Sequence, residues 1–187
     1  MNLVIKNKHQ IAIFISGKGS NAKRLVEFFR EHNDIEIAII VSTKSNVDIQ
    51  KICLQNNIDY IESLDVIDSI KNKKIDLIVL AGYLKLIPEK LIHQFPNHIV
   101  NIHPSLLPKF GGKGMYGRKV HQSVIESGEK ESGITIHYVN QNYDEGEIIK
   151  QIKIKISDSE TIDTLESKIH DIELENFPKT IEQILCK

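Results

Sequence analysis

Short aliphatic runs alternate with amphipathic segments along most of the chain, and this alternation limits the possible folds more than any other feature. Continuous apolar runs are typical of strands buried on both faces, and the intervening segments have helical spacing. We therefore expect an α/β fold, with a Rossmann-like, mostly parallel central sheet and helices on both faces. Near the C-terminus isoleucines alternate with lysines, which predicts an antiparallel edge portion of the sheet.

The pattern sets approximate bounds for each element. The expected strands are residues 11–15, 35–41, 75–80, 99–101, 133–140 and 148–156, and the expected helices are 22–32, 47–55, a short helix opened by Pro88, 119–126 and 161–185. We expect Leu25, Phe28 and Phe29 to face the core, strand 133–140 to keep one wetter face, and the last helix to be interrupted near Pro178. A single domain over residues 1–187 is expected.

Composition excludes several classes of protein. The 187 residues are 41% hydrophobic, enough for one substantial core, and the formal charge of −1 gives no reason to expect nucleic acid or a membrane surface as partner. Two cysteines, Cys53 and Cys186, are too few for a disulfide framework and have no metal-ligand spacing. The first eight residues lack the apolar region of a signal peptide, so a cytoplasmic protein is expected, as a monomer or homodimer.

The most informative chemical motif is the run from Asn101 to Pro108, together with Asp144 further along the chain. Asn101 and His103 are two residues apart on an expected strand, so both side chains project to the same side. An amide N–H and an imidazole would then converge where an oxyanion can form. Asp144, brought up behind His103, is expected to raise its pKa and favour the charged ring. This set suits acyl or formyl transfer to an amine that is itself the nucleophile.

A second motif is the loop from Ser16 to Ala22, between the first expected strand and its helix. Its glycines allow a close backbone approach, and Ser20 or Asn21 is expected to cap a helix whose free N–H groups face an anion. The spacing also fits a dinucleotide fingerprint, but that fingerprint needs an acidic residue after the second strand, where residues 42–44 are Ser, Thr and Lys. A single phosphate is favoured over a dinucleotide.

These motifs resemble, in the same order and over nearly the whole chain, those of the phosphoribosylglycinamide formyltransferases within the formyltetrahydrofolate-dependent formyltransferase family. The matching segments are residues 17–21, 101–108, 133–137 and 144–146. The resemblance implies transfer of a formyl group from 10-formyltetrahydrofolate to the amine of 5-phosphoribosylglycinamide in purine biosynthesis, by direct attack through a tetrahedral intermediate and without a metal.

The resemblance also implies roles for individual residues. It makes Asn101, His103 and Asp144 catalytic, and it assigns substrate binding to Gly19, Ser20, Asn21 and Glu173. It assigns folate binding to Leu84, Lys85, Leu86, Ile87 and Asn101, with residues 140–144 as the other wall of the folate site. His137 either borders this site or is an ordinary buried strand histidine. The glycine-rich segment 110–117 is predicted to be a mobile lid.

Other functions stay open at this stage. Methionyl-tRNA formyltransferase and formyltetrahydrofolate hydrolase share the pattern of Asn101, His103 and Asp144. These enzymes usually have a longer chain with an added domain, for which 187 residues leave no room. An NAD-dependent oxidoreductase is disfavoured by residues 42–44. A non-catalytic folate or nucleotide sensor would have no use for the complete catalytic set.

Overall fold

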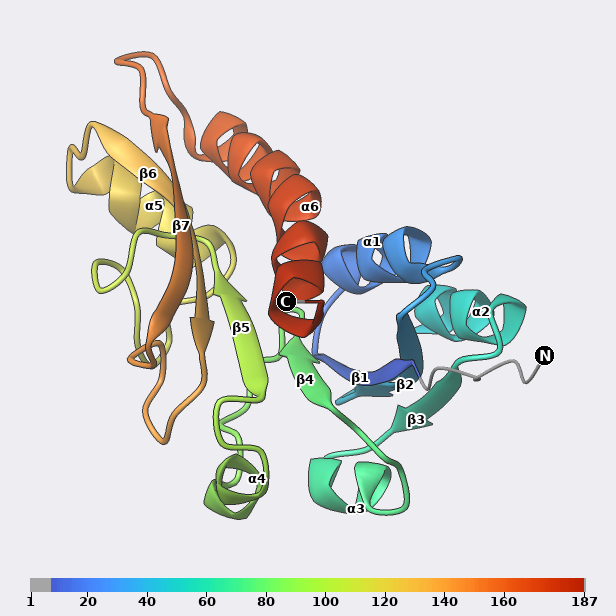
Figure 1. Cartoon of the computed structure of the whole chain (residues 1–187). Helices are drawn as coiled ribbons and strands as arrows, with labels where there is room; N and C mark the ends of the chain where they lie inside the picture. Colours follow the sequence, from blue (N-terminus) through green and yellow to red (C-terminus); the bar gives the residue numbers. More distant parts are fainter. Residues whose placement is uncertain (1–7, 187) are drawn as a thin grey trace. The chain divides into compact units, whose positions relative to one another are not determined.

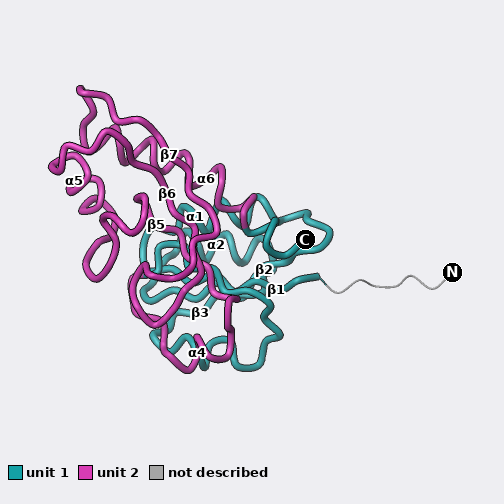
Figure 2. The backbone as a smooth tube through the Cα atoms, turned by 60° about the vertical axis from the view of Figure 1, so that its left-hand side comes forward, with its two compact units in different colours: residues 1–83, 181–187 teal, residues 84–180 magenta. Residues whose placement is uncertain are grey.

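The computed structural model describes residues 8–186, which form two compact units (Figure 2). The first unit contains the residues up to Tyr83 together with those from Ile181 onward, and the second contains Leu84–Thr180. The expectation of a single domain stays a prediction. The expected lack of a signal region concerns residues that, apart from Lys8, lie outside the described part of the chain.

The first unit is a parallel α/β layer structure. Its strands are β1 (His9–Ile15), β2 (Ile35–Ser42), β3 (Asp59–Glu62) and β4 (Leu77–Leu80), in the order β3-β2-β1-β4, and its helices are α1 (Ser20–Phe29), α2 (Val47–Gln55) and α3 (Val66–Ile70). Helices α1 and α2 lie on one face of this sheet and α3 lies on the other (Figure 1). All four residues of β4 are buried, as expected for a parallel strand covered on both faces.

Strand order places a binding position at the carboxyl ends of β1 and β4. From β1 the chain continues to β2 on one side, whereas β4 pairs with β1 on the other side. Ligands of open α/β sheets bind beyond the carboxyl ends of the strands at such a reversal. Residues 16–21 follow β1 at this position, and the Ser16 backbone N–H donates to the Gly82 carbonyl, which follows β4, at 3.1 Å.

The second unit is built on antiparallel strands. Its elements are α4 (Glu89–Gln94), β5 (Ile99–His103), α5 (Arg118–Glu126), β6 (Glu131–Tyr138), β7 (Ile148–Lys155) and α6 (Ile162–Leu185), whose last residues belong to the first unit. Strand β6 pairs antiparallel with both β5 and β7. The α/β class, the parallel sheet and the antiparallel C-terminal portion are confirmed. Among residues 8–186, no helix has both the length and the apolar character to cross a bilayer.

Two expectations about burial are wrong. Strand β6 has no wetter face, because Ser132 to His137 are all buried and the turn after β5 covers one side of the strand. Phe28 is only half-buried: Leu25 and Phe29 form the inner stripe of α1, and the Arg24 guanidinium lies 5.8 Å from the centre of the Phe28 ring. A residue at the margin of an apolar stripe is shielded by a long polar neighbour rather than by the core.

Helix α6 continues through Pro178, contrary to the expected interruption. Proline removes one helical hydrogen bond and costs about 3 kcal/mol in a helix interior. Phe177, directly before it, is fully buried, and the Thr180 hydroxyl donates to the Asn176 carbonyl at 2.9 Å. Packing of this helix therefore outweighs the cost of the proline.

Candidate active site

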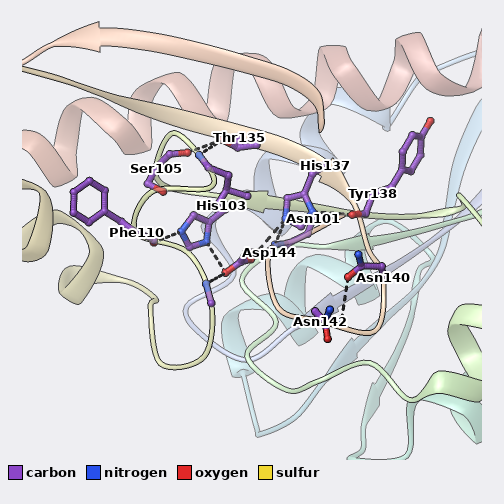
Figure 3. Close-up of polar contacts among 12 residues, drawn as sticks. Asn101, His103, Ser105, Phe110, Thr135, His137, Tyr138, Asn140, Asn142 and Asp144 are labelled. Carbon is purple, nitrogen blue, oxygen red and sulfur yellow. Dashed lines mark hydrogen bonds and ion pairs between the residues drawn. The ribbon is translucent and has the colours of Figure 1, made fainter. Parts of the chain in front are cut away.

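Asn101 and His103 lie on β5, where the antiparallel register aligns them with polar residues of β6. Asn101 is opposite His137, and His103 is opposite Thr135. Residues directly opposite in an antiparallel pair project to the same face, so the four side chains share one side of the two strands. Figure 3 shows Asn101, His103 and His137 gathered around Asp144, whereas Thr135 lies beside Ser105.

Asp144 reaches the two strands from the loop between β6 and β7. Its Oδ2 lies 3.4 Å from His103 Nδ1 and accepts the Gly112 backbone N–H at 2.9 Å, while its Oδ1 accepts from Asn101 Nδ2 at 3.4 Å (Figure 3). Asp144 has a positive φ of 59°, a left-handed conformation that Asp tolerates better than most residues. The structure thus brings the three residues expected to be catalytic into one network.

The nitrogens of both buried histidines have defined partners. His103 Nε2 lies 2.8 Å from the Phe110 carbonyl, so it carries a proton and donates it. His137 Nδ1 lies 2.8 Å from the Tyr138 carbonyl, and His137 Nε2 lies 3.0 Å from Asn101 Nδ2. The side chains of His103 and His137 are only 4% and 2% exposed.

Burial dominates the electrostatics of His103. Desolvation lowers its pKa below the ordinary value, against the raising effects of the Asp144 charge and the Phe110 carbonyl. The expectation that Asp144 leaves the ring with a raised pKa is therefore wrong for the free protein, because the loss of water outweighs the carboxylate. Burial also raises the pKa of Asp144, but the neighbouring His137 and His103 rings and the Gly112 N–H bring it below its ordinary value.

A buried threonine holds the turn that follows His103. The Thr135 hydroxyl donates to the Ser105 carbonyl at 2.6 Å and accepts the Leu107 N–H at 3.0 Å and Gln151 Nε2 at 3.0 Å. Ser105 donates its own hydroxyl to the Lys109 carbonyl at 2.6 Å. Ser105 is therefore a turn residue, and the turn that it helps to fix leads into residue 110, which meets His103.

The loop expected to bind phosphate lies in the first unit, and its helix cap differs from the expectation. Gly19, not Ser20 or Asn21, is the N-cap of α1; its φ is 78°, and no side chain caps the helix. Glycine takes this left-handed conformation without the cost that a side chain imposes. Asn46 Nδ2 holds the loop by donating to the Gly17 and Lys18 carbonyls at 3.0 and 3.2 Å.

The residues expected to bind folate lie in the second unit. Leu84 and Leu86 are exposed apolar side chains, at 44% and 50%, Lys85 is exposed, and Ile87 is buried. The opposite expected wall, residues 140–144, is held by the Asn140 side chain, which accepts the Asn142 N–H at 2.9 Å.

Glu173 does not lie on a solvated helix face. It is 9% exposed on α6, and its Oε2 lies 3.4 Å from His170 Nδ1. The Glu173 charge also acts to raise the pKa of both His103 and His121, although burial lowers both overall.

Several groups in this network could not be assigned from the sequence. His137 was ambiguous, and the Phe110 carbonyl and Gly112 N–H are backbone groups without a sequence signal. The glycine-rich segment 110–117 provides both backbone contacts, and its expected role as a lid stays a prediction.

Within residues 8–186, no three His, Cys, Asp or Glu side chains are grouped to hold a metal ion. Cys53 is a buried helix residue, and burial raises its pKa to about 11.

Comparison with known proteins connects this geometry to a family. The family model described as formyl transferase matches residues 9–181. A chloroplastic phosphoribosylglycinamide formyltransferase of Vigna unguiculata is 36% identical over 98% of this chain, and the enzyme of that name from Bacillus subtilis is 32% identical over 94% of this chain and 94% of its own length. The chain spans only 63% and 60% of the plant relatives from Vigna unguiculata and Arabidopsis thaliana.

Solved structures agree with the sequence relatives. The crystal structure of phosphoribosylglycinamide formyltransferase from Bacillus halodurans has a TM-score of 0.86 and 31% identity, covering 95% of this chain and 96% of that chain. A formyltetrahydrofolate deformylase from Pseudomonas syringae has a TM-score of 0.84, but its 23% identity supports a shared fold alone.

Proposed function

The chain belongs to the formyl transferase family, and on that premise we propose that it transfers a formyl group from 10-formyltetrahydrofolate to the amine of 5-phosphoribosylglycinamide, a step of purine biosynthesis. The observation that carries the proposal is the single network formed by Asn101, His103 and Asp144. Relatives named for this activity cover nearly the whole chain.

The proposed reaction begins when the neutral amine attacks the formyl carbon. A bond forms between the amine nitrogen and the carbon, and the formyl oxygen becomes negatively charged. Asn101 Nδ2 and His103 Nε2 are the donors that stabilise this oxygen. The bond from the carbon to the folate nitrogen then breaks, and one proton passes from the amine to that nitrogen. No covalent bond to the protein forms.

The contacts of His103 in the free protein support an order for its part in the proposed reaction. Its Nε2–H is donated to the Phe110 carbonyl in the free protein, so the formyl oxygen must take the place of that carbonyl. Negative charge on the formyl oxygen, together with Asp144 at 3.4 Å from Nδ1, then favours the doubly protonated ring, which takes up the proton lost by the amine and later returns it to the folate nitrogen. Burial keeps the free ring largely neutral, and the charge that develops during the reaction, supported by Asp144, favours the cation.

The remaining residue assignments belong to the same proposal. Gly19, Ser20 and Asn21, at the start of α1, bind the phosphate through backbone N–H groups. Glu173 binds the substrate near its amine. Residues 84–87 and Asn101 bind the folate ring, for which the exposed Leu84 and Leu86 offer apolar surface. We place the enzyme in the cytoplasm, with small molecules as its partners.

The direct test mixes the protein with both substrates and follows the deformylated folate by absorbance. We expect product only when the amine is present, and Asn101→Ala should lower kcat by about 10²-fold or more, because an oxyanion donor is lost. Asn72→Ala is the matched control, since Asn72 is an exposed turn residue. Equal deformylation with and without the amine would show a hydrolase, and no turnover with both substrates would overturn the proposal.

A further inference from the structure

We propose that His137 is a positioning residue that fixes the orientation of the Asn101 carboxamide, acting as a neutral imidazole protonated on Nδ1. The inference deepens the proposed function and rests on it, because orientation of Asn101 matters only if its N–H groups stabilise a reacting oxygen. His137 stands directly opposite Asn101 across β5 and β6 (Figure 3).

The first step concerns the proton on His137. Its Nδ1 lies 2.8 Å from the Tyr138 carbonyl oxygen, which can only accept a hydrogen bond. Nδ1 therefore carries a proton. In a neutral ring this leaves Nε2 as an acceptor, because an uncharged imidazole has one donor and one acceptor.

The second step concerns the amide. Asn101 Nδ2 is a donor, and it lies 3.0 Å from His137 Nε2, so the two groups are complementary only when Nε2 is unprotonated. Nε2 is 3.7 Å from Asp144 Oδ1, which is too long for a hydrogen bond. A His137 cation would set two donors 3.0 Å apart and would favour rotation of the amide by half a turn.

As a consequence, the two N–H groups of the Asn101 carboxamide have different roles. One is held firmly by His137, and the other faces Asp144 Oδ1 through a long contact of 3.4 Å. The second N–H is the one that can be released to a developing oxyanion. Without the acceptor on His137, the amide loses its stronger anchor, and its oxygen can rotate toward the position where negative charge forms. Burial of the His137 side chain, which is 2% exposed, removes water as a substitute acceptor.

Two variants and one control test this role through activity. His137→Phe keeps a ring but removes both nitrogens, and we expect kcat to fall by about 10- to 100-fold with little change in the KM of either substrate. His137→Gln can place a carbonyl oxygen near the position of Nε2 and should recover most of the loss. His98→Phe is the matched control: His98 Nδ1 also bonds a backbone carbonyl, that of Pro96 at 2.7 Å, but the side chain is exposed.

A double-mutant cycle separates positioning from a general structural role. If His137 acts through Asn101, His137→Phe should cause no further loss of kcat in the Asn101→Ala background. The same loss in both backgrounds would overturn the inference, as would full activity of His137→Phe alone. Non-additivity with Asp144→Asn but not with Asn101→Ala would overturn it too, because His137 would then act through the carboxylate.

The tautomer itself is measured on the unmodified protein. In a protein labelled with ¹⁵N-histidine, we expect a protonated-type signal for Nδ1 and an unprotonated-type signal for Nε2 of His137. A ring protonated on Nε2, alone or together with Nδ1, would overturn the inference even if no variant folded. If the unmodified protein transfers no formyl group, the proposed function fails by that result, while the spectrum still decides how His137 and Asn101 are paired.

Discussion

Replacement of Asp144 by Asn tests the electrostatic basis of the proposed mechanism. The carboxylate is 10% exposed and lies 3.4 Å from His103 Nδ1. Asn has almost the same shape, and its carbonyl oxygen can still accept the Gly112 N–H that Asp144 Oδ2 accepts at 2.9 Å. The change therefore removes the charge and keeps most of the packing.

The size of the effect follows from the distance. Two unit charges 3.4 Å apart attract with about 5 kcal/mol at an effective dielectric constant of 20, and each 1.36 kcal/mol is about tenfold in rate. Burial lowers the pKa of His103, so most of this attraction is realised only when the ring becomes charged during the reaction. Loss of an interaction that is made only in the transition state lowers kcat and kcat/KM equally. We expect both to fall by about 10²- to 10³-fold in Asp144→Asn.

The control and the pH profile decide the interpretation. Glu145→Gln also removes one carboxylate, from an exposed neighbour that accepts Asn142 Nδ2 at 2.7 Å, and it should leave kcat nearly unchanged. Because the Asp144 charge raises the pKa of His103, its removal should shift any His103-dependent limb of the kcat/KM profile to lower pH. Nearly full activity in Asp144→Asn, or a similar loss in Glu145→Gln, would refute the reasoning.

Three further outcomes are expected. In Gly146→Ala the new Cβ would lie 1.7 Å from the Tyr138 carbonyl oxygen, so thermal denaturation should show a loss of about 2–4 kcal/mol of unfolding free energy. Thr135→Val removes the hydroxyl of a buried residue together with its three hydrogen bonds and should cost about 1–3 kcal/mol in chemical denaturation, with a lower kcat; unchanged values would contradict its role in the turn. Burial lowers the pKa of His121, so below about pH 6.5 the unfolded chain binds more protons there and stability falls as pH falls. His170, whose pKa is raised, acts in the opposite sense, and His121→Leu should flatten the fall measured between pH 7.5 and 5.5.

The residue pattern predicted most elements of the fold and missed two short ones. Strand β3 and helix α3 have four and five residues, too few to show a repeat of two or 3.6 residues, and neither was expected. By contrast, the expected helix 47–55 matches α2 residue for residue, and in the structure Asn46 caps this helix by accepting the Ile49 N–H at 3.1 Å.

In the candidate site, the positions of side chains could be predicted from the sequence, but their protonation could not. The two-residue spacing of Asn101 and His103 predicts that their side chains share a side of the strand, and the register of β5 shows that they do. The charge state of His103 depends on how much water the fold removes and on one backbone carbonyl, and neither can be seen in a residue pattern. The sequence therefore indicates which groups meet, whereas only packing determines their protonation.

The contacts of the free protein give the proposed mechanism its order of events. Every donor assigned to the oxyanion already has a protein acceptor: His103 Nε2 has the Phe110 carbonyl, and Asn101 Nδ2 has His137 and Asp144. When the formyl group binds, its oxygen must therefore replace one of these protein acceptors. An exchange of one hydrogen bond for an equivalent one has little net cost in free energy. Phe110 has a positive φ of 56°, which costs a bulky residue about 1–2 kcal/mol, so release of this residue also relieves backbone strain. Displacement of the Phe110 carbonyl and exposure of the His103 proton are thus one event in the proposed mechanism, and the predicted lid depends on this exchange.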